Sequence, residues 1–303
     1  MKKNLGGVWR FSLENVSHGF FADDIWSKDY DDSQWRRVSV PHDWDGDNFL
    51  GERRTADGTD ELVEDSGWYR CHFAADGTMG QKRVFVEFGG VSKHCKAWCN
   101  GYYLGRHENS LMPFRFDVTD ALKGNAQDVV LALKVEQGKA SGARWYTGAG
   151  IGRPVNIRYV GDCYFEEAGV IFDGDYSGLF SVRVNLLRDD INVLPNAKEK
   201  HVAVRFTLSD SDGLVLFRGI KNVDLKNGEG RLVSFKGLLQ NVRCWSPAYP
   251  ELYHLHVELI CDNSSEPSDV YDSPVGFRSF VFDSAKAESR NSRSDVHIPM
   301  LAS

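Results

Sequence analysis

Hydrophobic and polar residues alternate with a period of two along most of the chain. In residues 128–137, DVVLALKVEQ, Leu131 and Leu133 share one face while Lys134 and Glu136 share the other. The same alternation recurs in residues 82–91, 154–160, 181–187, 201–210 and 253–260. This period is that of a β-strand, and no segment longer than about ten residues holds a helical period of 3.6. The pattern predicts an all-β chain of sandwiches or barrels, with one helical turn at residues 120–123 capped by Thr119 or Asp120.

The composition of the chain changes near residue 160. Of the 8 tryptophans only Trp245 lies beyond that point. The stretch from about residue 165 to 282 holds short strands separated by turn sequences such as DSDG and KNGEG, which is typical of a small immunoglobulin-like sandwich. We therefore predict one domain over residues 1–160 and an immunoglobulin-like β-sandwich over 161–283. Residues 284–303 are polar without periodicity and are expected to form a disordered or non-native tail.

Charge and hydropathy exclude several classes of partner. The net charge is −7 and lysines and arginines do not cluster, so we expect no nucleic-acid partner. No run of about 18 apolar residues exists, so we expect no transmembrane helix and no membrane partner. No apolar segment follows the lysines near the start, and a cytoplasmic location is therefore expected. The 6 cysteines form no C-x-x-C pair, which favours reduced, buried thiols.

Motifs for metal and cofactor binding are weak. The segment GAGIGRP, residues 148–154, superficially resembles a dinucleotide loop, but Pro154 and a strand follow it where a helix should begin. Its glycines are better explained by positive φ in a bend between strands. His254 and His256 share a strand face without a third metal ligand. We therefore expect no metal and no cofactor.

Aromatic residues in the same bend suggest a sugar pocket. Trp145 and Tyr146 follow Arg144, and sugar pockets combine flat rings with charged groups that bind hydroxyls. The alternative is that Trp145 fills the sandwich core and Arg144 binds carbonyl or carboxylate groups within the fold. The residues alone leave both interpretations open.

An ordered series of motifs resembles glycoside hydrolase family two, the β-galactosidase, β-glucuronidase and β-mannosidase group. The matching segments are residues 29–44, 66–73, 84–105, 112–122, 144–155, 242–259 and 276–283, which include PHDW, SGWYR, RWYTGAGIGRP and GFRSF. The resemblance implies that residues 1–160 form a jelly-roll β-sandwich, the sugar-binding domain of the family. It also implies that residues 144–155 bend beside the substrate pocket.

The resemblance further implies a set of substrate-binding residues. In the family, an Asp at the end of the strand before this bend approaches the sugar, and Glu136 occupies that place. Gln137 stands where an Asn is frequent, and Arg144, Trp145 and Tyr146 complete the expected set. Gly152 replaces a common aromatic residue, so the sugar contacts depart from the family pattern more than the fold does.

Full-length members of this family continue into a (β/α)8 barrel that carries two glutamates of a retaining mechanism. Residues 284–303 match no part of that continuation, as in a gene fragment or a frameshifted reading frame. We therefore expect no (β/α)8 barrel, no catalytic residue and no turnover by this chain alone. The chain would supply one wall of a pocket for a β-galactoside or related glycoside, and would self-associate through the surface that faces the barrel in the family. The alternative is a free-standing carbohydrate-binding module without hydrolase activity.

Overall fold

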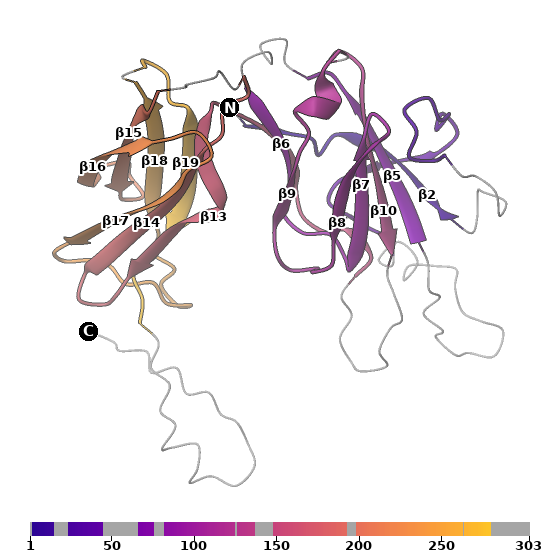
Figure 1. Ribbon diagram of the computed structural model, residues 1–303. Helices are drawn as coiled ribbons and strands as arrows, with labels where there is room; N and C mark the ends of the chain where they lie inside the picture. The colour runs from indigo at the N-terminus through magenta and orange to yellow at the C-terminus, as the bar shows by residue number, and fades with distance from the viewer. Residues whose placement is uncertain are drawn as a thin grey trace, which may run out of the picture. The chain divides into compact units, whose positions relative to one another are not determined.

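The protein forms two compact units, Met1–Gly161 and Asp162–Ser303, built almost entirely from β-strands (Figure 1). The computed structural model describes residues 2–14, 24–44, 66–75, 82–124, 126–136, 148–192, 198–262 and 264–279. The predicted all-β class is confirmed, and the described residues contain no (β/α)8 barrel. Within these ranges no helix has the length and apolar character needed to cross a membrane. The expected tail, residues 284–303, lies outside the described residues.

The first unit is a sandwich of two antiparallel sheets. The six-stranded sheet has the order β3-β2-β5-β10-β7-β8, and the four-stranded sheet has the order β1-β12-β6-β9. Figure 1 shows β2, β5, β10, β7 and β8 side by side, with β6 and β9 in the other layer. The strands are β1 (Lys2–Asn4), β2 (Val8–Leu13), β3 (Arg36–Ser39), β4 (His42–Asp43), β5 (Ser66–Phe73), β6 (Arg83–Phe88), β7 (His94–Cys99), β8 (Tyr102–His107), β9 (Phe114–Asp117), β10 (Val129–Glu136), β11 (Gly150–Ile151) and β12 (Val155–Val160).

Alternation along β10 explains how this sandwich closes. Leu131, Leu133 and Val135 are fully buried in the core, whereas Lys134 and Glu136 are only partly buried. Because successive strand residues point to opposite faces, the hydrophobic set of each sheet packs between the layers and the polar set stays outside. The predicted orientation of β10 is confirmed.

The helical turn expected near residue 120 is present as a 3-10 turn over Asp120–Leu122. Thr119 stands at the N-cap position, as predicted, but its side chain makes no capping hydrogen bond to the turn. Its hydroxyl accepts a hydrogen bond from the Val84 N–H and donates one to Asp117. The side chain therefore ties the turn to β6 and β9 and leaves the N-terminal amides of the turn uncapped.

The second unit has the seven strands of an immunoglobulin-like sandwich. One sheet has the order β13-β14-β17 and the other has the order β16-β15-β18-β19. The strands are β13 (Cys163–Gly174), β14 (Leu179–Arg188), β15 (Lys200–Ser209), β16 (Val215–Leu225), β17 (Gly230–Leu238), β18 (Tyr253–Cys261) and β19 (Asp269–Val275). Valines, leucines and phenylalanines fill the core between the sheets, and Phe206 and Phe277 are almost completely buried.

The cysteines differ in exposure more than the sequence indicates. All six are free thiols; Cys71, Cys95, Cys99 and Cys163 are buried, Cys261 is half-buried and Cys244 is exposed. The prediction of buried thiols is therefore confirmed for four cysteines and wrong for Cys244. Cys244 follows β17 in an irregular segment on the surface, which strand alternation does not describe.

Candidate functional site

The candidate site lies at one end of the six-stranded sheet, where β10 ends at Glu136. At this end Glu136 is the register partner of Ser66 on β5 and of His94 on β7. Leu13, the last residue of β2, is paired with Gly67 on β5, so β2 ends at the same level. Strand register thus brings together the ends of four strands that are far apart in the sequence. We call this group of residues (Leu13, Glu14, Ser66, Gly67, His94, Val135 and Glu136) the β10 end.

Two lysines flank the carboxylate of Glu136. Lys96 on β7 places its ammonium Nζ 3.3 Å from Glu136 Oε1, and Lys134 Nζ lies 4.0 Å from the same oxygen. Lys134 and Lys96 are themselves register partners on neighbouring strands. Since the Glu136 side chain keeps 36% of its surface exposed, the lysines orient the carboxylate without covering it.

Glu14 completes this charge network on the β2 side. Lys134 Nζ donates to Glu14 Oε1 at 2.7 Å, and the indole N–H of Trp68 lies 3.5 Å from the same atom. Burial raises the pKa of Glu14, but the hydrogen bond and charge of Lys134 outweigh burial and hold the pKa below its usual value. Glu14 is therefore a stable anion, unsuited to give up a proton as a general acid near neutral pH.

A tight backbone contact lies beside the β10 end, where β4 pairs with β11. Asp43 is the register partner of Gly150, and its carboxylate accepts a hydrogen bond from the Ala149 N–H at 2.8 Å. Gly148 has a φ of +70° and a Cβ there would lie 2.6 Å from Asp43 Oδ2, so only glycine fits. Positive φ is confirmed at Gly148 and Gly150 of the glycine-rich bend, and the N–H of the bend binds a carboxylate of the fold, in place of a phosphate.

Trp44, the last residue of the PHDW motif, is buried on the core side of the same end. A Cβ on Gly67 would lie 2.8 Å from the Trp44 ring, so glycine at this strand position makes room for the indole. The ring stacks on Phe11 at a centroid distance of 5.6 Å. Among the described residues no acceptor pairs with the Trp44 indole N–H, which leaves one donor to be satisfied at this end of the sandwich.

Of the five predicted substrate-binding residues, Glu136 is the one that the structure describes. Gln137, Arg144, Trp145 and Tyr146 fall in residues 137–147, outside the described residues. The two interpretations of Trp145 therefore both stay open. The described chain stops directly after Glu136 and resumes at Gly148, next to Asp43.

Sequence reasoning found one neighbour of Glu136 and missed the others. Alternation along β10 placed Lys134, two residues earlier, on the same face as Glu136. Lys96 and Glu14 come from other strands, and their approach depends on register that local patterns do not reveal.

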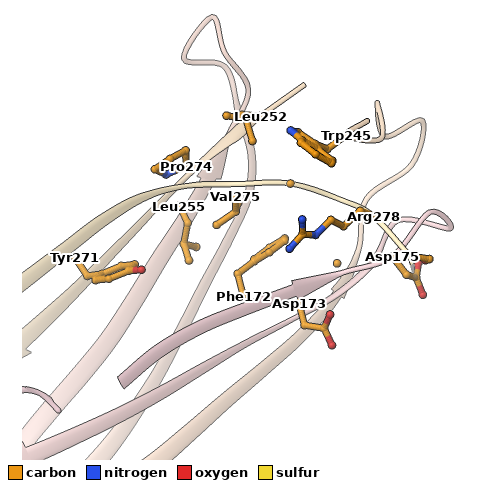
Figure 2. A pocket seen from close by; sticks show the side chains of 13 residues that line it. Phe172, Asp173, Asp175, Trp245, Leu252, Leu255, Tyr271, Pro274, Val275 and Arg278 are labelled. Carbon is orange, nitrogen blue, oxygen red and sulfur yellow. The ribbon is translucent and has the colours of Figure 1, made fainter. Parts of the chain in front are cut away.

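Two surface hollows lie elsewhere, and neither contains Glu136. The first, of about 680 Å³, is in the second unit (Figure 2), where Trp245 and Leu252 lie on one side and Phe172 and Asp173 on the other. The Arg278 guanidinium lies over the Trp245 ring at 5.6 Å and so already covers one ring face. The second hollow, of about 520 Å³ in the first unit, is lined by Val8, Arg10, Tyr30, Asp31, Asp32, Ser33, Arg37 and His72.

His254 and His256 share a face of β18, as predicted, and both point toward Asp272 on β19. His256 Nδ1 lies 2.6 Å from Asp272 Oδ1, and His254 Nε2 lies 3.5 Å from the same oxygen. The described residues contain no group of three or more His, Cys, Asp or Glu side chains that could hold a metal ion. Among the described residues, His254 and His256 form a surface ion-pair group with Asp272.

The His256 contacts predict a pH-dependent contribution to stability. Burial lowers the pKa of His256, but hydrogen bonds and charges of Asp272 and Glu258 outweigh burial and raise the pKa above its usual value. A raised folded-state pKa stabilises the fold below about pH 6.5, and this contribution disappears as pH rises through the folded-state pKa. We expect His256→Gln to lower the free energy of unfolding more at about pH 5.5 than at about pH 9, by less than about 1 kcal/mol because solvent screens the pair. Urea unfolding of both proteins at the two pH values measures this difference, and an equal or larger loss at high pH would contradict it.

Comparison with known proteins identifies the family of both units. Residues 2–159 match the model of the "Glycosyl hydrolases family 2, sugar binding domain", and residues 180–278 match the model "Glycosyl hydrolases family 2". The chain is 28% identical to a beta-glucuronidase of Formosa agariphila, with 92% of this chain and 30% of the relative covered. It is 27% identical to the beta-galactosidase BoGH2A of Bacteroides ovatus, with 96% of this chain and 33% of the relative covered.

Solved structures give the same result. A family 2 glycosyl hydrolase from Bacteroides cellulosilyticus superposes with a TM-score of 0.75 at 25% identity, over 93% of this chain and 37% of that protein. A beta-glycosidase from Bacteroides vulgatus superposes with a TM-score of 0.71 at 27% identity, over 93% of this chain and 34% of that protein. The chain spans about a third of the length of the curated relatives above and matches their N-terminal portion. The chain therefore belongs to glycosyl hydrolases family 2.

Proposed function

We propose that the chain is the sugar-binding and immunoglobulin-like part of an exo-acting retaining glycosidase, and that the β10 end supplies one wall of its sugar pocket. The observation that carries this proposal is the half-exposed carboxylate of Glu136, held by Lys96 and Lys134 at one end of the family's sugar-binding domain. Relatives named beta-galactosidase and beta-glucuronidase support a β-galactoside or related glycoside as the ligand.

The chemistry of the β10 end suits a ligand rich in hydroxyl groups. A carboxylate accepts about four hydrogen bonds, so the 3.3 Å contact with Lys96 leaves oxygen lone pairs of Glu136 for sugar hydroxyls. The ammonium groups of Lys96 and Lys134 donate hydrogen bonds to hydroxyl oxygens in turn.

The described carboxylates support binding and not bond cleavage. A retaining glycosidase needs a protonated acid and a nucleophile about 5 Å apart across one anomeric carbon. Glu14 has a lowered pKa and is hydrogen-bonded by Lys134, so it is not suited to act as the general acid. We therefore assign Glu136 a role in substrate binding and expect the catalytic pair elsewhere in a full-length enzyme.

Ligand-observed saturation-transfer NMR with methyl β-galactoside tests the proposal on the 303-residue chain. We expect weak binding, with a Kd in the range of about 1 mM or above because one wall gives few contacts. Glu136→Ala should weaken binding at least about threefold, since one charged hydrogen bond contributes about 1 kcal/mol or more. The matched control is Glu258→Ala, which removes a partly exposed strand carboxylate from the second unit.

If Glu136→Ala bound the sugar as tightly as the unsubstituted chain, Glu136 would not be part of the sugar-binding site. Micromolar or tighter binding by the isolated chain would instead favour the free-standing carbohydrate-binding module. Self-association, a cytoplasmic location and the identity of the sugar stay predictions.

A further inference from the structure

The second unit contains two cysteines that meet inside its sandwich. Cys163 is the first residue of β13 and Cys261 is the last residue of β18, so they come from different sheets. Their thiols are in hydrogen-bond contact. Cys163 belongs to the hydrophobic core cluster between the sheets, and Cys261 packs against that cluster.

Ser268 holds the two cysteine positions together. Its hydroxyl donates a hydrogen bond to the Cys163 carbonyl at 2.6 Å and also contacts the Cys261 side chain. Its backbone N–H donates to the Leu259 carbonyl at 2.7 Å, two residues before Cys261. The start of β13 is therefore tied to the end of β18 by bonds that do not involve either sulfur.

The two thiols differ in access to solvent. Cys163 is fully buried, whereas Cys261 is half-buried at the end of its strand. Cys261 is thus the more accessible of the two neighbouring thiols. Thiol pairs that oxidise reversibly have this arrangement, in which an accessible cysteine reacts and a neighbouring cysteine resolves the product.

Charges around the pair favour a thiolate on the accessible sulfur. The hydrogen bond from Cys163, helped by the nearby Lys200 ammonium, lowers the pKa of Cys261 against the opposing effect of burial. The same thiol–thiol hydrogen bond and burial raise the pKa of Cys163. Lys200 is fixed in place by ion pairs with Asp162 and, at 3.4 Å, with Asp190. Cys261 is therefore the attacking sulfur and Cys163 the sulfur that keeps its proton until the second step.

We propose that Cys261 and Cys163 are a thiol modification site that a small-molecule disulfide converts into an intramolecular disulfide. The Cys261 thiolate attacks one sulfur of the reagent, which forms a mixed disulfide and releases one thiolate. The Cys163 sulfur then attacks Cys261 Sγ, the Cys163–Cys261 bond forms, and a second reagent thiolate leaves. The two cysteines lose two electrons and two protons, and the reagent disulfide gains them as two thiols.

The new bond would fasten the two sheets of the second unit to each other. It would close a loop of about 100 residues, and a cross-link of that span restricts the unfolded chain strongly. The oxidised form should therefore unfold at a higher Tm than the reduced form, and dithiothreitol should reverse the shift.

The test uses the full chain carrying Cys244→Ser, because exposed Cys244 would form a separate adduct. Burial raises the pKa of Cys71, Cys95 and Cys99 to about 12, so these thiols should stay unreacted in the folded protein. After incubation with oxidised glutathione, thiol titration in denaturant should fall from five to three groups, and peptide mass mapping should recover a Cys163–Cys261 link. A second substitution, Cys163→Ser, should stop the reaction at one glutathione adduct on Cys261.

Three results would overturn the proposal. They are a lasting glutathione adduct on Cys261 in the Cys244→Ser chain, a full complement of five thiols after incubation, or an oxidised form whose Tm equals that of the reduced form. Peptide mapping of the unsubstituted chain gives the same decision without any substitution, since a Cys163–Cys261 link either forms there or does not.

Discussion

Replacing Arg70 by methionine is expected to lower the free energy of unfolding of the first unit by about 3–5 kcal/mol. The Arg70 side chain is completely buried on the outer side of β5 under residues 25–32. Its guanidinium donates to Asp32 at 2.7 Å and to the carbonyls of Ile25 and Ser27 at 2.5 and 2.9 Å. Methionine keeps the hydrophobic contacts of the side-chain stem but removes the guanidinium donor from all three acceptors.

Asp32 explains why the loss should be large. Burial raises the pKa of Asp32, but hydrogen bonds and charges of His72 and Arg70 outweigh burial and hold the pKa below its usual value. Without Arg70, this largely buried carboxylate keeps the 2.7 Å contact with His72 Nε2 among the described side-chain contacts. Removal of one partner from a buried ion pair costs more than the pair contributes when intact.

Tryptophan fluorescence during urea unfolding reports mainly on the first unit, because Trp245 is the one tryptophan beyond Gly161. Arg106→Met is the matched control, since the Arg106 side chain is 71% exposed and should change the unfolding free energy by less than about 0.5 kcal/mol. Equal midpoints for the two variants would show that the Arg70 contacts do not stabilise the unit.

Replacing Phe277 by alanine is expected to destabilise the second unit by about 3–5 kcal/mol. Phe277 belongs to the GFRSF motif that ends the described chain, and its side chain is fully buried. The ring meets Tyr253 at 5.1 Å and Phe172 at 5.4 Å, so it joins β18 to β13 through the core. Alanine would remove the ring and leave a cavity, and both terms reduce stability.

Hydrogen–deuterium exchange followed by mass spectrometry separates this effect from the first unit. Peptides of β14 and β15 should exchange faster in Phe277→Ala, while peptides of β5 and β10 should keep their rates. Tyr249→Ala, with a side chain that is 74% exposed, is the control and should leave exchange unchanged. Unchanged exchange in Phe277→Ala would mean that the motif does not anchor the sandwich.

The alternation of apolar and polar residues predicted most of the fold but few of the contacts of the candidate site. Alternation predicted which face of β10 is buried. The apolar side chains of Leu131 and Leu133 are stable in the core, whereas the charged groups of Lys134 and Glu136 need solvent or ion-pair partners. The burial of Arg70 could not be foreseen, because its acceptors are carbonyls aimed by the irregular chain of residues 25–30.

The neighbours of Glu136 were equally hidden. Its contact with Lys96 joins residues 40 positions apart and depends on the register of β10 against β7. A shift of one residue in that register would move Lys96 to the core face and remove the ion pair. The family resemblance pointed to Glu136 itself, but its ion pair with Lys96 follows from strand register and not from any local pattern.

The central claim is that the β10 end binds sugar, and amide chemical-shift mapping of the ¹⁵N-labelled chain during titration with methyl β-galactoside tests it most directly. We predict that shift changes centre on the amides of Glu136, Ser66 and His94 and that those of the second unit stay in place. Changes confined to the Trp245 hollow, or none at saturating sugar, would contradict the claim.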